Sequence, residues 1–209
     1  MRLTSTSIKD GHPIHERYAL GVADPEQHIK LGQNLSPQIS WENLPEGTAS
    51  LVLICHDPDA PSKPDDVNQE GREVPGDLAR VDFYHWVLVD IDPKLEELRE
   101  AEFSQGVTPH GKKGPDAPRN CRQGLNNYTE WFTGDSEMEG HYYGYDGPCP
   151  PWNDSITHRY IFTLYALDIP RCPVEGSFGA LEVLKAIKGH ILAKDSITCT
   201  YSLNPRFKQ

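Results

Sequence analysis

Apolar, strand-forming runs separated by long irregular connections are the feature that most restricts the fold of this chain. The runs are rich in β-branched and aromatic residues, which is typical of strands. They lie at 50–57 (SLVLICHD), 83–91 (FYHWVLVDI), 159–168 (RYIFTLYALD) and 196–203 (SITCTYSL). The connections at 58–82 and 104–157 are rich in Gly, Pro and Asp and are longer than most loops of compact domains. With no repeat or linker in 209 residues, the pattern predicts one mostly β domain, 1–209.

Two segments favour helices around this predicted sheet. Asp92 and Pro93 would supply an N-cap and a first helical residue for the following KLEELREAEF. Residues 179–194 place apolar side chains at helical spacing, which predicts an amphipathic helix docked on the sheet.

The charge and the chain ends limit the classes of function. The net charge is −11, and Lys and Arg form only short clusters, so a nucleic-acid partner is not expected. No apolar stretch is long enough to cross a membrane, and the N-terminus lacks the apolar core of a secretory signal. We therefore expect a cytoplasmic protein.

The five cysteines favour neither a disulfide framework nor a zinc site, because their number is odd and none forms a CxxC pair. Cys149 lies in a proline-rich loop, where we expect it to pack against the prolines. Neither a metal nor another cofactor is expected.

Polar residues interrupt the apolar faces of three predicted strands. By strand alternation, Asp57 shares a face with the apolar residues of its run, and His85 shares one with Val87. His158 and Tyr160 project to the same side of the third run. Because buried carboxylates and imidazoles need partners, we expect Asp57, His85 and His158 to meet in one pocket.

A stiff loop directly precedes His158. In GPCPPWND, residues 147–154, the prolines fix their own φ angles and cannot donate backbone hydrogen bonds. We expect Pro150 and Pro151 to form a wall of the pocket, with His158 and Tyr160 presented into it from the start of the strand.

Two long motifs resemble the phosphatidylethanolamine-binding proteins, the family that includes the Raf kinase inhibitor protein. They are LSPQISWENLPEGTASLVLICHDPDAP at 35–61 and YDGPCPPWNDSITHRYIFTLYALD at 145–168. GHIL at 189–192, expected in the last helix, is similar to the bacterial, Raf-kinase-inhibitor-like branch. The resemblance implies an antiparallel β-sandwich with a few peripheral helices, in agreement with the reading of the strands.

The resemblance also implies a site. Asp57, His85 and His158 match residues that line a small anion pocket for phosphate or the phosphorylethanolamine head group of a phospholipid. Tyr160, Pro150 and Pro151 match its rim. We expect Asp57 to accept a hydrogen bond from one imidazole and leave that ring's other nitrogen for the ligand. Three neighbours are expected to be structural: Asp59 paired with Arg159, and Trp86 in the core.

Other functions remain open at this point. Asp57, His85 and His158 are also a common ligand set for a catalytic metal, so a metal-dependent phosphoester hydrolase is the main alternative to a binding module. The resemblance further implies inhibition of a kinase or a protease, and a homodimer. The long loops 61–85 and 104–144 could form a lid or a partner surface.

Overall fold

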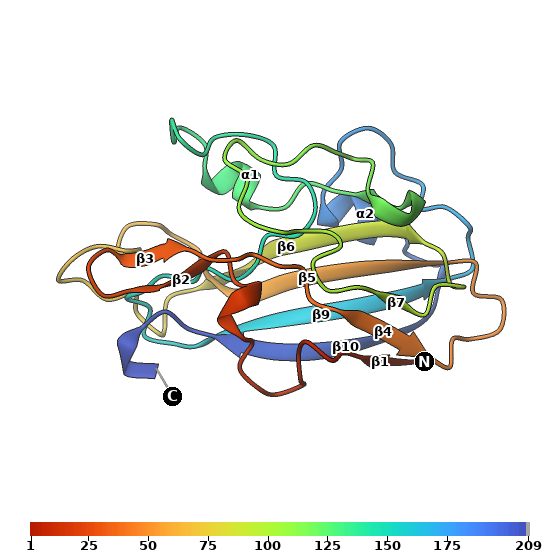
Figure 1. Ribbon diagram of the computed structural model, residues 1–209, viewed down its shortest axis with the longest axis horizontal. Coiled ribbons are helices and arrows are strands. Elements are labelled where there is room, and N and C mark those ends of the chain that lie inside the picture. The colour runs from red at the N-terminus through yellow and green to blue at the C-terminus, as the bar shows by residue number, and fades with distance from the viewer. Residues whose placement is uncertain (208–209) are drawn as a thin grey trace.

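The computed structural model describes residues 1–207. Its main sheet has five strands in the order β10–β9–β5–β6–β8, and each neighbouring pair is antiparallel. These strands are β5 (Ser50–Pro61), β6 (Arg80–Ile91), β8 (Arg122–Gln123), β9 (His158–Leu167) and β10 (Ile191–Tyr201). The four long strands cross the molecule side by side (Figure 1).

A second, smaller sheet packs against one face of the main sheet. It consists of β1 (Arg2–Thr4), β4 (Ile39–Glu42) and β7 (Glu97–Leu98), again antiparallel. The largest apolar core lies between the sheets: Leu51 and Trp86 come from the main sheet, and Ile39 and Leu98 from the smaller one. This arrangement confirms the predicted antiparallel β-sandwich.

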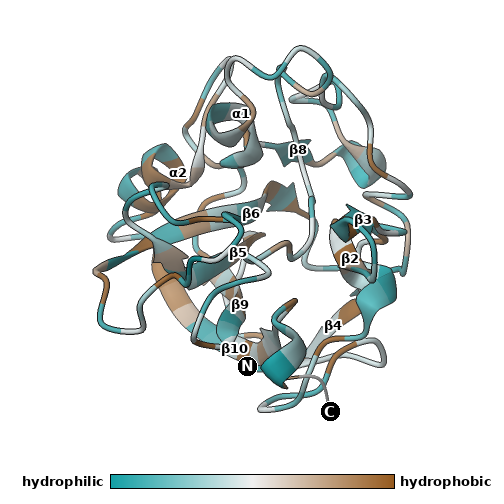
Figure 2. Ribbon diagram, turned by 90° about the vertical axis from the view of Figure 1, so that its left-hand side faces the viewer, coloured by the Kyte–Doolittle hydropathy of each residue, from teal (hydrophilic) through white to brown (hydrophobic). Residues whose placement is uncertain are grey.

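The opposite face of the main sheet is covered by helix α2 (Ala180–Ala186). Val183 and Ile187 pack there against Val52 and Val87. Helix α1 (Tyr128–Trp131) lies on the same side in Figure 1, and the outer loops are largely hydrophilic in Figure 2. The remaining helical turns are short 3₁₀ segments, at Glu16–Tyr18, Pro118–Asn120 and Pro205–Phe207.

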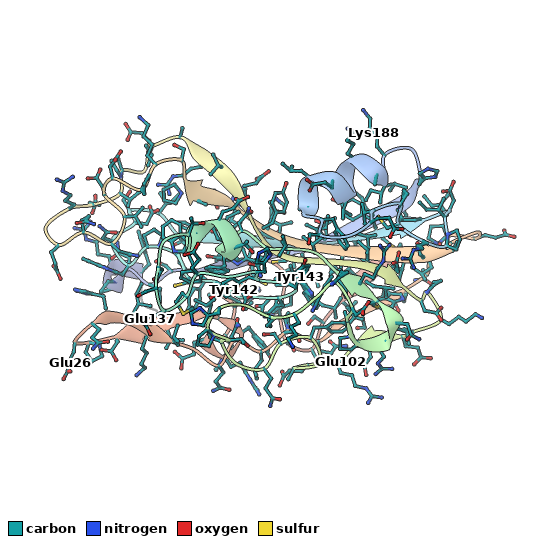
Figure 3. The ribbon with its side chains drawn as sticks, turned by 90° about the horizontal axis from the view of Figure 1, so that it is seen from above. Glu26, Glu102, Glu137, Tyr142, Tyr143 and Lys188 are labelled. Carbon is teal, nitrogen blue, oxygen red and sulfur yellow. The ribbon has the colours of Figure 1, made fainter. Side chains whose placement is uncertain are left out.

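A third apolar cluster packs two parts of the long connection that precedes β9, one of them α1, against the N-terminal segment. Tyr128 of α1 packs there with Leu20 and Tyr142. Figure 3 shows Tyr142 near the middle of the molecule, whereas Glu26 and Lys188 lie at its periphery. Part of the connection 104–157 is thus a buried layer and not an open loop.

A hairpin of β2 (Gly21–Asp24) and β3 (His28–Leu31) closes one end of the sandwich. Tyr201, the last residue of β10, donates its hydroxyl to the carbonyl oxygen of Gly21 at 3.0 Å. Tyr201 also pairs with His158, the first residue of β9. The hairpin therefore lies at the end of the sheet where β9 begins, and Figure 1 shows it at the same end as the last described residues, Pro205–Phe207.

The predicted helix at 92–103 is wrong. Asp92 does cap a turn, since its side chain accepts the N–H of Lys94 at 2.9 Å and its carbonyl oxygen accepts the N–H of Leu95 at 3.0 Å. The chain then becomes extended, and Leu98 pairs with Ile39 of β4 and is fully buried. Tertiary burial of Leu98 outweighs the local helical signal.

The predicted helix at 179–194 is correct only for its first half. The chain turns after Ile187, at Gly189, whose positive φ of 93° favours glycine. Ile191 already begins β10, so GHIL forms a turn and a strand start. His190 pairs there with Asp168, with 2.9 Å between Nδ1 and Oδ1.

The four strands predicted from the sequence are confirmed as β5, β6, β9 and β10, and β5, β6 and β10 are longer than expected. The five cysteines are free thiols. Between residues 1 and 207, the model contains no helix with the length and hydrophobicity needed to cross a membrane.

Candidate functional site

A cavity of about 260 Å³ lies at the end of the main sheet where β9 begins. Its polar lining side chains include Asp57, His85, His158 and Tyr160, each at most 3 % exposed; we call these four the floor. Most other lining residues are apolar, and they include Leu20, Ala60, Val67, Phe83, Tyr128, Phe132, Met138, Pro150 and Pro151. The cavity thus combines a buried polar floor with apolar walls, and it brings together every ligand-binding residue predicted from the sequence.

A β-bulge in β6 brings His85 to the floor. Trp86 pairs with Cys55 but Tyr84 pairs with the next residue, His56, so His85 is an extra residue in this strand. Strict alternation would place His85 on the face of Val87, which packs under α2. The bulge turns it to the opposite side, as bulges near functional sites often do.

His158 is held between two carboxylates. Its Nδ1 lies 2.7 Å from Asp57 Oδ2 and its Nε2 lies 3.0 Å from Asp154 Oδ2. Both ring nitrogens must carry hydrogen to satisfy these acceptors, so the ring is an imidazolium. Burial alone would lower the pKa of His158, but the hydrogen bonds and charges of Asp154 and Asp57 outweigh it and raise the pKa to about 9.

Arg80 completes this buried row of charges. It donates from both terminal nitrogens to Asp154, at 2.6 and 3.0 Å. Burial raises the pKa of Asp154, yet hydrogen bonds from His158 and Arg80 overcome it and leave the pKa below its usual value. Asp57, His158, Asp154 and Arg80 therefore alternate in sign, and their formal charges sum to zero.

His85 is neutral and has a defined tautomer. Its Nδ1 donates to the backbone carbonyl oxygen of Asp146 at 2.8 Å, and because a carbonyl can only accept, the proton is on Nδ1. The Asp146 carboxylate is itself fixed by Asn34, Asn126 and Lys112, at 2.7 to 2.9 Å. Burial lowers the pKa of His85, so Nε2 carries a lone pair at neutral pH.

Tyr160 contributes a hydroxyl with no hydrogen-bond partner anywhere in residues 1–207. Burial, and after it the negative charge of the nearby Asp57 carboxylate, raise the pKa of this phenol well above its usual value, so it remains an O–H donor. Tyr160 lines the cavity, and an unpaired, buried hydroxyl is costly to the free protein, so a polar ligand group that reached it would stabilise it.

The mouth of the cavity is rimmed by large apolar side chains. Leu31, Val81 and Trp131 all line it and are each about half exposed. Lys63, also exposed, adds a cation at this rim. Cys149 lines the wall, where burial raises the pKa of its thiol to about 12, so it is an un-ionised packing residue.

The neighbours expected to be structural have structural contacts. Arg159 donates from its backbone N, Nε and one terminal nitrogen to the Asp59 carboxylate at 2.8 to 2.9 Å. Trp86 is fully buried in the core between the sheets. Trp152, in the proline-rich loop, stacks on His28 with 3.9 Å between ring centroids.

One predicted role is wrong. We expected the imidazole bonded to Asp57 to keep a nitrogen for the ligand, but Asp154 occupies the second nitrogen of His158. The available ring nitrogen belongs to His85. Two aspartates that hold the histidines, Asp154 and Asp146, and the cations paired with them, Arg80 and Lys112, were not predicted from the sequence. The position of Asp154, four residues before His158 in a rigid loop, is a weak signal for that pair.

Asp57, His85 and His158 are not arranged as the ligands of a metal ion. Across the described chain, no group of three His, Cys, Asp or Glu side chains is arranged to hold a metal ion. His158 points both nitrogens at carboxylates, which leaves Asp57 and His85 Nε2 as the available donors on the floor. The hydrolase alternative therefore lacks the three-residue ligand set on which it was based.

A β-sandwich that holds a pocket with buried polar groups and apolar walls is typical of a small-ligand-binding protein. Comparison with known proteins then identifies the family. The phosphatidylethanolamine-binding protein family model matches residues 4–202, and the chain belongs to this family.

The relatives agree in sequence and in structure. The chain is 30 % identical to the UPF0098 protein YbhB of Escherichia coli over 97 % of this chain and all of that one. It is 34 % identical to a UPF0098 protein of Methanothermobacter thermautotrophicus over 85 % of this chain and 89 % of that one. The crystal structure of Escherichia coli YbcL, described as a new member of the mammalian PEBP family, superposes with a TM-score of 0.67 at 26 % identity, covering 96 % and 97 % of the two chains.

Proposed function

We propose that this protein is a binding module that holds a small phosphorylated head group, such as phosphate or phosphorylethanolamine, on the floor of the cavity. The observation that carries the proposal is that two residues with unused polar groups, Tyr160 with its unpaired hydroxyl and His85 with its available Nε2, line the floor of the same cavity. The two rings are neighbours, with 5.2 Å between their centroids. A hydroxyl that donates and a nitrogen that can accept, or donate once protonated, form a small polar socket.

The walls support an amphiphilic ligand over a free inorganic ion. Phe83, Phe132 and Met138 line the cavity, and Trp131 continues this apolar surface to the rim. A head group on the floor would direct an attached apolar chain along these walls towards solvent. Lys63 at the rim could pair with a second negative group.

The test is a calorimetric titration with phosphate and with O-phosphorylethanolamine, using wild-type protein and His85→Ala. We expect saturable binding that His85→Ala weakens by about tenfold or more, since it removes one charge-assisted hydrogen bond. His190→Ala is the matched control, because it removes an exposed histidine at the opposite end of β9. Equal affinities in all three proteins would contradict the assignment of the floor.

Inhibition of a kinase or a protease and formation of a homodimer remain predictions from the resemblance. Sedimentation of the purified protein tests the dimer: a single 23.5 kDa species at micromolar concentration would contradict it. Inhibition is tested by adding the protein to purified kinases and proteases with and without phosphorylethanolamine.

A further inference from the structure

The floor offers more hydrogen-bond acceptors than donors. Asp57 Oδ1 accepts the N–H of Asp59 at 2.7 Å and Oδ2 accepts from His158, yet each carboxylate oxygen can accept a second bond. The Nε2 of His85 adds a lone pair. The hydroxyl of Tyr160 is the donor that the floor presents, because both N–H groups of His158 are already used.

The floor also carries no surplus positive charge. His158 and Arg80 are balanced by Asp57 and Asp154, and Lys112 is balanced by Asp146 at 2.9 Å. An anion that reaches the floor therefore meets the carboxylate of Asp57 without a free cation beside it. Contact between two oxygen atoms that can only accept is repulsive, and in a buried site water cannot relieve it.

We infer that the pocket selects head groups that bring their own hydrogen to the floor, either a protonated phosphoryl oxygen or an ammonium group, and rejects fully deprotonated oxyanions. The inference rests on the proposed function and narrows its ligand class. A hydrogen phosphate ion would donate its P–OH to Asp57 or to His85 Nε2 and accept from Tyr160 with another oxygen. Phosphorylethanolamine would place its ammonium group in the same role.

Sulfate is the probe that separates this inference from simple anion binding. It has nearly the size and charge of hydrogen phosphate, but it carries no proton at pH 7. A site whose buried acceptors are left without donors loses orders of magnitude in affinity. In parallel calorimetric titrations at pH 7, we expect sulfate to bind at least about 100-fold more weakly than phosphate.

The possible outcomes distinguish this inference from the proposed function. Phosphate binding with sulfate far weaker supports both. Equal binding of the two ions overturns the selectivity and leaves the binding module intact. Binding of neither ion nor O-phosphorylethanolamine overturns the proposed function itself.

Substitutions on the floor test whether the acceptors of Asp57 and His85 cause the preference for phosphate over sulfate. Asp57→Asn and His85→Gln each replace an acceptor by an amide that can donate, so the preference for phosphate over sulfate should fall by about tenfold in each. His85→Gln leaves the His158 charge row untouched and keeps the test valid where Asp57→Asn does not fold. Tyr160→Phe is the control: it removes a donor that both ions use, so both affinities fall and their ratio stays. An unchanged ratio in folded Asp57→Asn and His85→Gln would overturn the assignment.

The same chemistry could come from a free metabolite or from a lipid head group. A short-chain phosphatidic acid, used below its micellar concentration, presents a protonatable phosphoryl group on an apolar tail. Tighter binding than inorganic phosphate assigns the lipid source, because the tail would be buried along the apolar walls. Weaker binding assigns the free head group.

Discussion

The Nε2 of His158 lies 3.0 Å from Oδ2 of Asp154, a residue only four positions earlier in the chain. This pair fixes the turn between the proline-rich loop and β9, and it commits His158 to its charged form. Both nitrogens of His158 are therefore used within the protein, and Nε2 of His85 is the ring nitrogen available to a ligand.

The charge on His158 makes stability depend on pH on the alkaline side. The folded-state pKa of about 9 is above the usual value of 6.5, so the stabilisation is complete below about pH 6.5 and is lost as the pH rises through 9. The expected loss is roughly 3 kcal/mol of the free energy of unfolding. Urea unfolding of wild-type protein and His158→Gln from pH 6 to 10 checks this, because the difference between the two should shrink over that window. A constant difference would contradict it.

Removing Arg80 should destabilise the fold, because Asp154 is 1 % exposed and would lose its bidentate partner. We expect Arg80→Met to cost about 3 kcal/mol in the free energy of unfolding. Arg2→Met is the matched control, since its ion pair with Glu42 is solvent-exposed and should be worth less than about 1 kcal/mol. A similar loss in the free energy of unfolding for the two variants would show that the buried ion pair stabilises the fold no more than the exposed one.

Gly147 has no room for a side chain. A Cβ at this position would overlap the carbonyl oxygen of Tyr18, which is rigid backbone. Gly147→Ala should displace the proline-rich wall, lower the free energy of unfolding by about 2 kcal/mol or more and weaken ligand binding. Gly76→Ala is the control, because its Cβ would meet only side-chain atoms, of Ser155 at 3.2 Å and Ile156 at 3.3 Å, which can shift by a few tenths of an ångström. Thermal melting and the phosphate titration measure both effects.

Trp131 should report on the apolar part of a ligand. Its side chain is half exposed at the rim of the cavity, so an apolar chain lying on it should shift its fluorescence to shorter wavelength. Short-chain phosphatidic acid should cause this shift in wild-type protein but not in Trp131→Phe, and inorganic phosphate should cause none. An equal shift in the variant would place the apolar chain elsewhere.

The central strands were predictable because they consist mostly of apolar residues, as strands buried on both faces do. β5 and β9 are largely apolar, and both faces of these two central strands are mostly buried. The start of β10 was not predictable, since GHILAK fits a helical period as well as a strand. The helix predicted after Asp92 was wrong for a related reason. Asp92 does cap the chain, but only for one turn, and burial of Leu98 in the core is more favourable than continuing the helix.

The sequence predicted which residues line the site, but it did not predict the hydrogen bonds that hold them. Asp57, His85 and His158 stand out because polar groups on apolar faces must find partners. Alternation nevertheless gave the wrong face for His85, because a bulge leaves no clear mark in a single sequence. The partner that sets its tautomer is the backbone carbonyl of Asp146, and a backbone atom carries no side-chain signal at all.

The balanced charges of the floor have a kinetic consequence. Among the described residues that line the cavity, Lys63 at the rim is the one cation that is not paired with a carboxylate, so an approaching phosphate feels mainly the molecule's formal net charge of −11, which repels it at long range. Salt screens this repulsion over about 8 to 10 Å at physiological ionic strength. The rate of association with an anionic ligand should therefore rise with added salt, the reverse of what an electrostatically steered pocket shows, and capture would depend on short-range hydrogen-bond fit.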